Sequence, residues 1–172
     1  MRELITKSTP LSKVLRLGKE CRKCGHCCRY GTGFLVKEDT PKIAKFLKLT
    51  EKELIKNCLE KVTKFNTTLY RPVSAKNKKP YGVCIFYNTE KGCTIHPVKP
   101  LHCRISNCNE YGENISVWFH LNYFVNSHDP QSIREWALYL GAGGKNIPGG
   151  TLAELVPDKK ILRKILNYEV LK

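Results

Sequence analysis

The spacing of apolar residues predicts a helix that begins near residue 40. Thr40 and Pro41 suit the N-cap and the first helical position, because proline has no N–H to leave unpaired there. The apolar face of this helix comprises Ile43, Phe46 and Leu47. One side of the helix is therefore expected to be buried.

A second helix is predicted to follow directly. Thr50 and Glu53 match a capping box, in which each side chain accepts a hydrogen bond from the other residue's backbone N–H. Leu54, Cys58 and Val62 then recur every four residues, which is the period of one helix face. Cys58 is therefore expected to pack in the core, where free cysteine is common.

The remaining segments predict short strands and further helices. Segments 67–73 and 81–87 suit strands, and a turn should follow with Gly92 at its end. Residues 115–125 are almost continuously apolar, so periodicity does not separate a buried strand from a buried helix. Residues 133–140 have helical spacing, with Gly141 as the expected C-cap.

The last segment, residues 158–171, is expected to form an amphipathic helix. Its predicted apolar side comprises Ile161, Leu162, Ile165 and Leu166. Its predicted cationic side comprises Lys159, Lys160, Arg163 and Lys164.

A length of 172 residues suits one unit with appendages. We expect an α+β fold: a small, irregular, metal-stabilised domain with a helical pair between two cysteine groups, short strands and a C-terminal helical extension. The predicted parts are a basic arm over 1–20, a cysteine-cluster domain over 21–108 and an extension over 109–172 packed on the same unit.

The cellular compartment bears on the nine cysteines. The N-terminus lacks the apolar stretch of a signal peptide, and no segment approaches a membrane span, so a cytoplasmic protein without membrane contact is expected. In a reducing compartment, clustered thiols are more often metal ligands than disulfides.

Apart from Cys58, the cysteines form two groups of four. The candidate metal ligands are Cys21, Cys24, Cys27, Cys28, Cys84, Cys93, Cys103 and Cys108. Pairs spaced C-x2-C occur both in zinc knuckles and in ferredoxin-type iron–sulfur sites. Gly25 suits the required turn because glycine accepts a positive φ.

The adjacent pair Cys27 and Cys28 raises the question of how many sites are present. Neighbouring side chains diverge in an extended segment, which favours two sites or one multinuclear site. Alternatively, Cys28 is simply packed inside. Among the histidines, His96 and His26 are expected to hydrogen-bond around the site, or His96 to serve as an alternative ligand.

The ordered combination C-x2-C-G-x-C-C, C-x-F, G-C-x-I-H-P and K-P-x-x-C-R, followed by a last cysteine, resembles the YkgJ-type CxxCxxCC cysteine-cluster family. The resemblance runs from Cys21 to Cys108 and implies a zinc- or iron-chelating domain. Lys99 stands where members commonly carry arginine, and Ser106-Asn107 where they carry Phe-Pro, which makes Cys108 the least secure ligand.

Longer members of this family include flagellin lysine N-methylases, so an enzyme or enzyme subunit is one alternative that the resemblance implies. No catalytic residue is identified. The glycine-rich stretch 139–150 follows a predicted helix instead of a strand, so a helix end is favoured over a phosphate or cofactor loop.

The chain is strongly basic, with 30 Lys and Arg against 15 Asp and Glu and a formal charge of +15. Some of these cations adjoin cysteines and could offset thiolate charge. Further candidate phosphate contacts are Lys76, Lys78 and Lys79, together with the cations of the last helix.

Three classes of function therefore remain open. The first is a metal-binding protein that holds a [4Fe–4S] cluster or zinc in a structural or electron-transfer role, with another protein as partner. The second is a zinc-stabilised protein that binds RNA or a ribonucleoprotein. The third is an enzyme related to the methylases.

Overall fold

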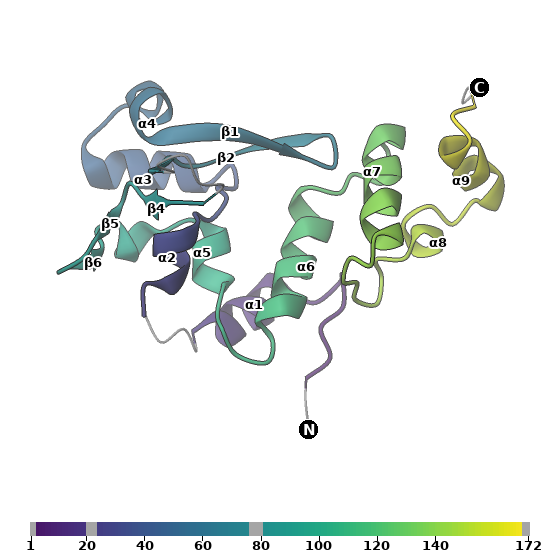
Figure 1. Ribbon diagram of the computed structural model, residues 1–172, viewed down its shortest axis with the longest axis horizontal. Coiled ribbons are helices and arrows are strands. Elements are labelled where there is room, and N and C mark those ends of the chain that lie inside the picture. Colours follow the sequence, from purple (N-terminus) through teal and green to yellow (C-terminus); the bar gives the residue numbers. More distant parts are fainter. Residues whose placement is uncertain (1–2, 20–23, 76–80, 170–172) are drawn as a thin grey trace. The chain divides into compact units, whose positions relative to one another are not determined.

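A computed structural model describes residues 3–19, 24–75 and 81–169 of the protein (Figure 1). Helices and short antiparallel strand pairs make up the described chain, which confirms the predicted α+β class. Within these ranges, no helix is both long and apolar enough to cross a membrane. The chain divides into two compact units, which are described separately.

The first unit, called the helical unit, comprises Met1–Leu17, Thr63–Thr68 and Cys108–Lys172. Its helices are α1 (Leu11–Gly18), α6 (Gly112–Tyr123), α7 (Pro130–Gly141), α8 (Leu152–Leu155) and α9 (Lys159–Leu166). Both tryptophans of the chain lie in its core and donate indole N–H groups to carbonyls. Trp118 bonds Thr9 at 2.9 Å and Trp136 bonds Gly150 at 2.8 Å.

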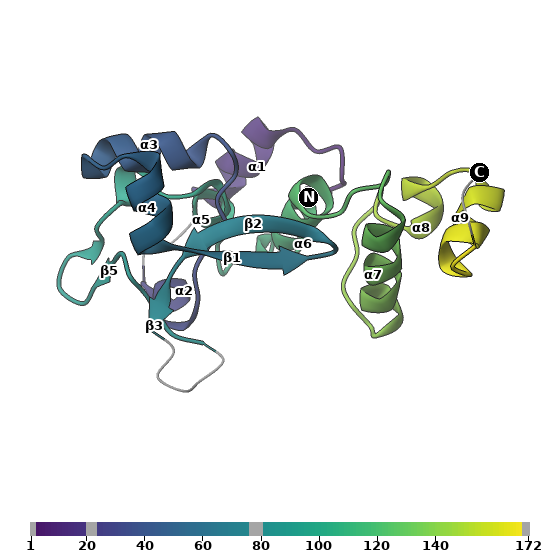
Figure 2. The same cartoon turned by 90° about the horizontal axis from the view of Figure 1, so that it is seen from above.

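Strands β1 (Leu59–Lys64) and β2 (Thr67–Pro72) form a hairpin, which is the long ribbon in Figure 2. Phe65 and Asn66 at its tip have φ angles of 48° and 56°, as a two-residue hairpin turn requires. The tip belongs to the helical unit, where the Phe65 ring packs edge-on against Trp136. Asn66 also donates its backbone N–H to Glu135 at 2.8 Å.

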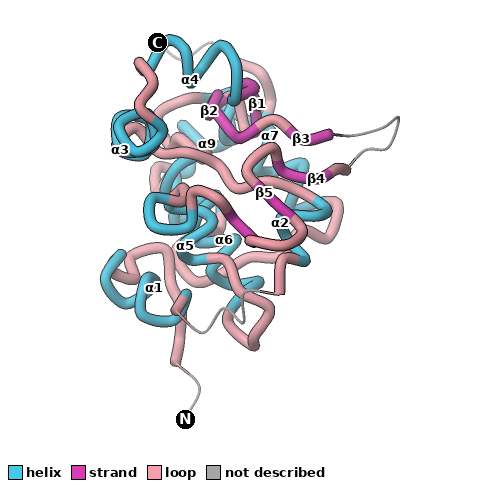
Figure 3. Tube along the Cα trace, turned by 90° about the vertical axis from the view of Figure 1, so that its left-hand side faces the viewer, coloured by secondary structure: helices cyan, strands magenta, loops and turns pink. Residues whose placement is uncertain are grey.

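The second unit, called the cysteine unit, comprises Gly18–Val62 and Leu69–Asn107. Its helices are α2 (His26–Tyr30), α3 (Asp39–Leu47), α4 (Glu51–Cys58), η1 (His96–Val98) and α5 (Leu101–Ile105). Figure 3 shows its short strands among long loops: β3 (Ser74–Ala75), β4 (Val83–Cys84), β5 (Tyr87–Asn88) and β6 (Gly92–Cys93). Its core comprises Leu35, Ile43, Ala44, Leu54, Leu59, Phe86 and Ile95.

The helical pair occurs as α3 and α4, and the capping box of Thr50 and Glu53 is present. Helix α4, however, ends at Cys58, and Val62 lies in β1. The period of four therefore holds only through Cys58, which is half-buried against the core. Val62 and Thr63, which follow Lys61, are β-branched and suit a strand better than a helix.

Some boundaries and burials also differ from the prediction. Helix α3 begins at Asp39, one residue before the expected N-cap, and Phe46 is exposed while Ala44 is buried. Segment 81–87 contains two short strands separated by a turn, and segment 115–125 is largely the helix α6. The C-cap of α7 is Ala142 instead of Gly141.

Candidate metal centre

Two candidate ligands lie on consecutive short hairpins of the cysteine unit. Cys84 pairs with Ser74 across β3–β4, and Cys93 pairs with Tyr87 across β5–β6. Gly92 has the positive φ, 74°, that the predicted turn needs. In both hairpins the backbone N–H two residues further on, from Phe86 or Ile95, donates a hydrogen bond to the thiol sulfur.

Helix α2 carries the adjacent cysteines, and it packs against β4. It follows Gly25, whose φ of 72° confirms the predicted left-handed turn. A side chain at Gly25 would also collide with the ring of Tyr87 on β5. Consecutive residues of a helix point about 100° apart. Cys28 is accordingly half-buried while Cys27 is exposed.

The fourth thiol of this site, that of Cys103, approaches from α5 and rests against Gly33. The backbone N–H of Gly33 donates a hydrogen bond to its sulfur. A Cβ at residue 33 would overlap this sulfur and lie 3.0 Å from the backbone nitrogen of Cys103. Glycine is therefore required for the close approach of the two segments.

These thiols lie close enough to raise one another's pKa. Burial, and then the neighbouring thiols of Cys93, Cys27 and Cys84, raises the pKa of Cys28 to about 11. Burial, and then the thiols of Cys84, Cys28 and Cys93, raises the pKa of Cys103 to about 12. Removing protons from these thiols together is therefore unfavourable unless a cation compensates the charge.

The remaining thiols of the group behave in the same way. Burial and the Cys93 thiol raise the pKa of Cys84 to about 11, and burial also raises that of Cys93. Lys99 acts in the opposite direction on Cys28 and Cys93. This cation thus offsets thiolate charge, as one interpretation of the local basic residues predicts.

A buried carboxylate positions the helix that carries Cys103. Asp39 is 1% exposed, and it accepts hydrogen bonds from the backbone N–H groups of Val36 at 3.0 Å and Leu101 at 2.8 Å. The guanidinium of Arg104 lies 3.1 Å from the same carboxylate. Because Leu101 and Arg104 flank Cys103, these contacts fix the start of α5.

Three histidines, His26, His96 and His102, lie in the cysteine unit, and none has a demonstrated role as a metal ligand. The Nδ1 atom of His102 accepts a hydrogen bond from the backbone N–H of Phe34 at 3.3 Å, and the two rings stack. His96 opens η1, directly after Ile95 and half-buried. His26 packs on Tyr30 at 4.8 Å. The predicted roles of His96 and His26 stay predictions.

Other predicted residues are not part of this convergence. Cys24 is exposed before α2, and Cys108 is exposed in the helical unit. Cys21, Lys76, Lys78 and Lys79 lie outside the described residues. Among the described cysteines, all are free thiols. Cys58 packs against the core, and burial raises its pKa without a contribution from another thiol.

The donor set fits a thiophilic metal. All four converging side chains are thiols, and those of Cys84, Cys93 and Cys103 accept backbone N–H hydrogen bonds, as ligands of zinc and iron–sulfur sites do. Over the described residues, no group of three or more His, Cys, Asp or Glu is already arranged to hold a metal ion. The thiols nevertheless raise one another's pKa, because charges interact over longer distances than the roughly 3.8 Å that separates sulfurs bound to one zinc ion.

A protein-family model, CxxCxxCC, described as "Putative zinc- or iron-chelating domain", matches residues 20–122. The chain belongs to this family. The match covers more than half of the 172 residues and extends past Cys108, where the resemblance was expected to end. No curated protein and no solved structure matches the chain significantly.

Membership in the CxxCxxCC family confirms the recognition made from the cysteine pattern and supports a metal as partner. Three structural residues of the site were missed by sequence reasoning: Gly33, Asp39 and Tyr87. Asp39 has the ordinary position of an acid in the first turn of a helix. Only the contact with Leu101, 62 residues away, reveals its role.

Proposed function

We propose that this CxxCxxCC protein binds zinc or an iron–sulfur cluster through cysteine thiolates. The proposal rests on the proximity of Cys28, Cys84, Cys93 and Cys103 in the cysteine unit, where α2 packs against β4 and both Cys84 and Cys93 pack against the core. Thiolates select zinc and iron–sulfur clusters over hard cations such as Mg²⁺. A bound cation would also offset the burial and the mutual repulsion that otherwise keep these thiols protonated.

The adjacent cysteines take different roles in this proposal. Cys28, the inward thiol of α2, joins the three thiols of the hairpins and α5 as a four-thiolate set. Cys27 lies on the outer side of the same helical turn. Cys27 is then left for a second metal or for the outer part of a multinuclear cluster. Cys21, Cys24 and Cys108 stay predicted ligands. A role for Cys27 outside the four-thiolate set would explain why two cysteines stand side by side.

The role of the metal is structural or electron transfer. Cys84 and Cys93 pack against the apolar core of the cysteine unit, so a metal held there would join the hairpins to that core. Structural metal sites contribute about 10–16 kcal/mol of apparent binding free energy in small domains, which is as much as a domain's whole stability.

One experiment distinguishes the metals and tests the proposal. The full chain is purified anaerobically, and its metal content and ultraviolet-visible spectrum are measured. Stoichiometric zinc without visible absorption identifies a zinc protein. Iron and acid-labile sulfide, with broad visible absorption that bleaches on reduction, identify an iron–sulfur protein. Protein that folds and retains neither metal after reconstitution contradicts the proposal.

A further inference from the structure

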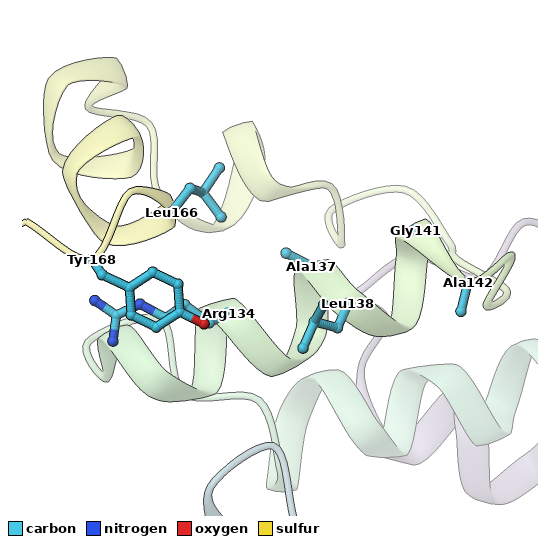
Figure 4. Close-up of a pocket in the computed structure, with 7 residues that line it drawn as sticks. All are labelled: Arg134, Ala137, Leu138, Gly141, Ala142, Leu166 and Tyr168. Carbon is cyan, nitrogen blue, oxygen red and sulfur yellow. The ribbon is translucent and has the colours of Figure 1, made fainter.

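A groove of about 480 Å³ separates α7 from the C-terminal segment of the helical unit (Figure 4). The wall from α7 and its C-cap consists of Ala137, Leu138, Gly141 and Ala142. Leu166 and Tyr168 contribute the opposite wall. Except at its Arg134 end, the groove is therefore lined by small or apolar side chains.

The apolar side chains around this groove are incompletely covered. Ile165 of α9 is buried, as its position on the apolar face predicts, but Ile161 is 43% exposed and Leu166 is 37% exposed. Leu138 on α7 is 70% exposed. The two helices thus pack through only part of their apolar surfaces, and the rest faces the groove or solvent.

Arg134 defines one end of the groove. Its Nε–H donates to the carbonyl of Ile165 at 2.6 Å, and its guanidinium stacks over the Tyr168 ring at 4.2 Å. These contacts hold the α9 end of the groove in place. This end of the groove is therefore shaped by contacts within the helical unit.

Positive charge surrounds the same opening. Arg163 lies three residues before Leu166, so this cation neighbours a lining residue on the α9 surface, and Lys164 follows it directly in the same helix. Lys159 and Lys160 extend this charge along α9. None of these four cations forms an ion pair with a carboxylate of the described chain.

The acidic residues at the two ends of the α9 segment, Asp158 and Glu169, accept hydrogen bonds. Asp158 caps α9 by accepting the N–H groups of Lys160 and Ile161. Glu169 accepts a hydrogen bond from the Asn167 side chain. Residues 158–169 hold four cations against these two carboxylates, so the segment carries a formal net charge of +2.

We propose that this groove docks an acidic amphipathic helix of a partner protein. Apolar side chains of the partner would fill the groove, and its carboxylates would face Arg163 and Lys164. A second copy is disfavoured because each chain carries a formal charge of +15. RNA would pair with the cations but would leave the apolar lining uncovered. A lipid surface is flat and would not fill a concave groove. This inference does not depend on the metal.

The test selects short random peptides, displayed on phage, against the metal-loaded full chain at physiological salt. The enriched peptides should be acidic, with apolar residues at helical spacing. Their synthetic forms should bind Leu138→Glu at least about tenfold more weakly than the unchanged protein, because this substitution places a carboxylate in the groove. The double variant R163E/K164E should weaken binding similarly, and high salt should reduce it.

Leu4→Glu is the matched control, because Leu4 lies in the same unit and is 68% exposed. It should bind the peptides as the unchanged protein does. Enriched peptides that are neutral or basic, or that bind Leu138→Glu undiminished, overturn the proposal. Binding of folded RNA or phosphatidylserine vesicles that is lost in Leu138→Glu, without acidic peptide binding, also overturns it and assigns the face to that ligand.

Discussion

Asp39 in α3 and Leu101 at the start of α5 are 62 residues apart in the sequence and are joined by a buried hydrogen bond of 2.8 Å. Through this bond and the ion pair with Arg104, the carboxylate fixes the helix that carries Cys103. The contact makes Asp39 a positioning residue of the candidate metal centre, although it is not itself a proposed ligand.

Asp39→Ala should lower the free energy of unfolding by about 3 kcal/mol and reduce metal content. The substitution leaves two buried N–H groups without their acceptor and a partly buried guanidinium without its counter-ion. Urea unfolding of metal-loaded protein, followed by far-ultraviolet circular dichroism, measures the loss. Glu60→Ala is the control: it breaks a more exposed pair with Arg71 and should cost about 1 kcal/mol or less. Equal effects would mean that Asp39 has no special role.

Gly33→Ala should impair metal binding through steric overlap with Cys103. Gly31→Ala is a matched control two residues away, because its added Cβ would meet nothing closer than 3.9 Å. Its φ of −175° is also accessible to alanine. Metal content and thermal unfolding of the two variants, measured in parallel, should separate them. Full metal occupancy and unchanged stability in Gly33→Ala would show that α5 shifts without consequence.

Serine substitutions at Cys28, Cys84, Cys93 or Cys103 should each abolish or sharply reduce metal loading, because a tetrahedral site loses one of four ligands. Cys58→Ala should keep the metal and cost about 1–2 kcal/mol, since it removes only part of a half-buried side chain from the core. Metal analysis per chain is the measurement. Stoichiometric metal in Cys28→Ser or Cys103→Ser would remove that residue from the ligand set.

The helical unit should lose stability as pH falls through the range that His120 controls. Burial, with the nearby charge of Lys64, lowers the pKa of His120 to about 4, against 6.5 ordinarily. Between about pH 6.5 and pH 4 the unfolded chain therefore binds more protons than the folded one, so the free energy of unfolding falls as pH falls. The expected loss is roughly 2 kcal/mol.

Tryptophan fluorescence follows this transition selectively, because Trp118 and Trp136 both lie in the helical unit. His120→Asn should flatten the pH dependence over this window. His128→Asn, at an exposed histidine of the same unit, should leave it intact. A slope that survives unchanged in His120→Asn would assign the acid sensitivity to other groups.

Local chemistry determined the features that the sequence predicted correctly. The capping box of Thr50 and Glu53 joins residues three apart, and the left-handed turn at Gly25 depends on one residue's lack of a Cβ. The α+β class and a helix within the predicted segment 158–171, present over 159–166, likewise follow from spacing within short segments, and the family recognition follows from the order of the cysteine motifs. Such features need no knowledge of which distant segment lies opposite.

Contacts between distant segments decided the rest. Helical spacing placed Phe46 on an apolar face, but burial depends on what covers that face, and Phe46 is exposed. The local sequence does not indicate which of the adjacent Cys27 and Cys28 side chains is buried. The helical turn of α2 and its packing on β4 bring Cys28 into the group with Cys84, Cys93 and Cys103. The reach of Asp39 to Leu101 and the fit of Cys103 against Gly33 are likewise tertiary, because each joins groups that only the folded chain brings together.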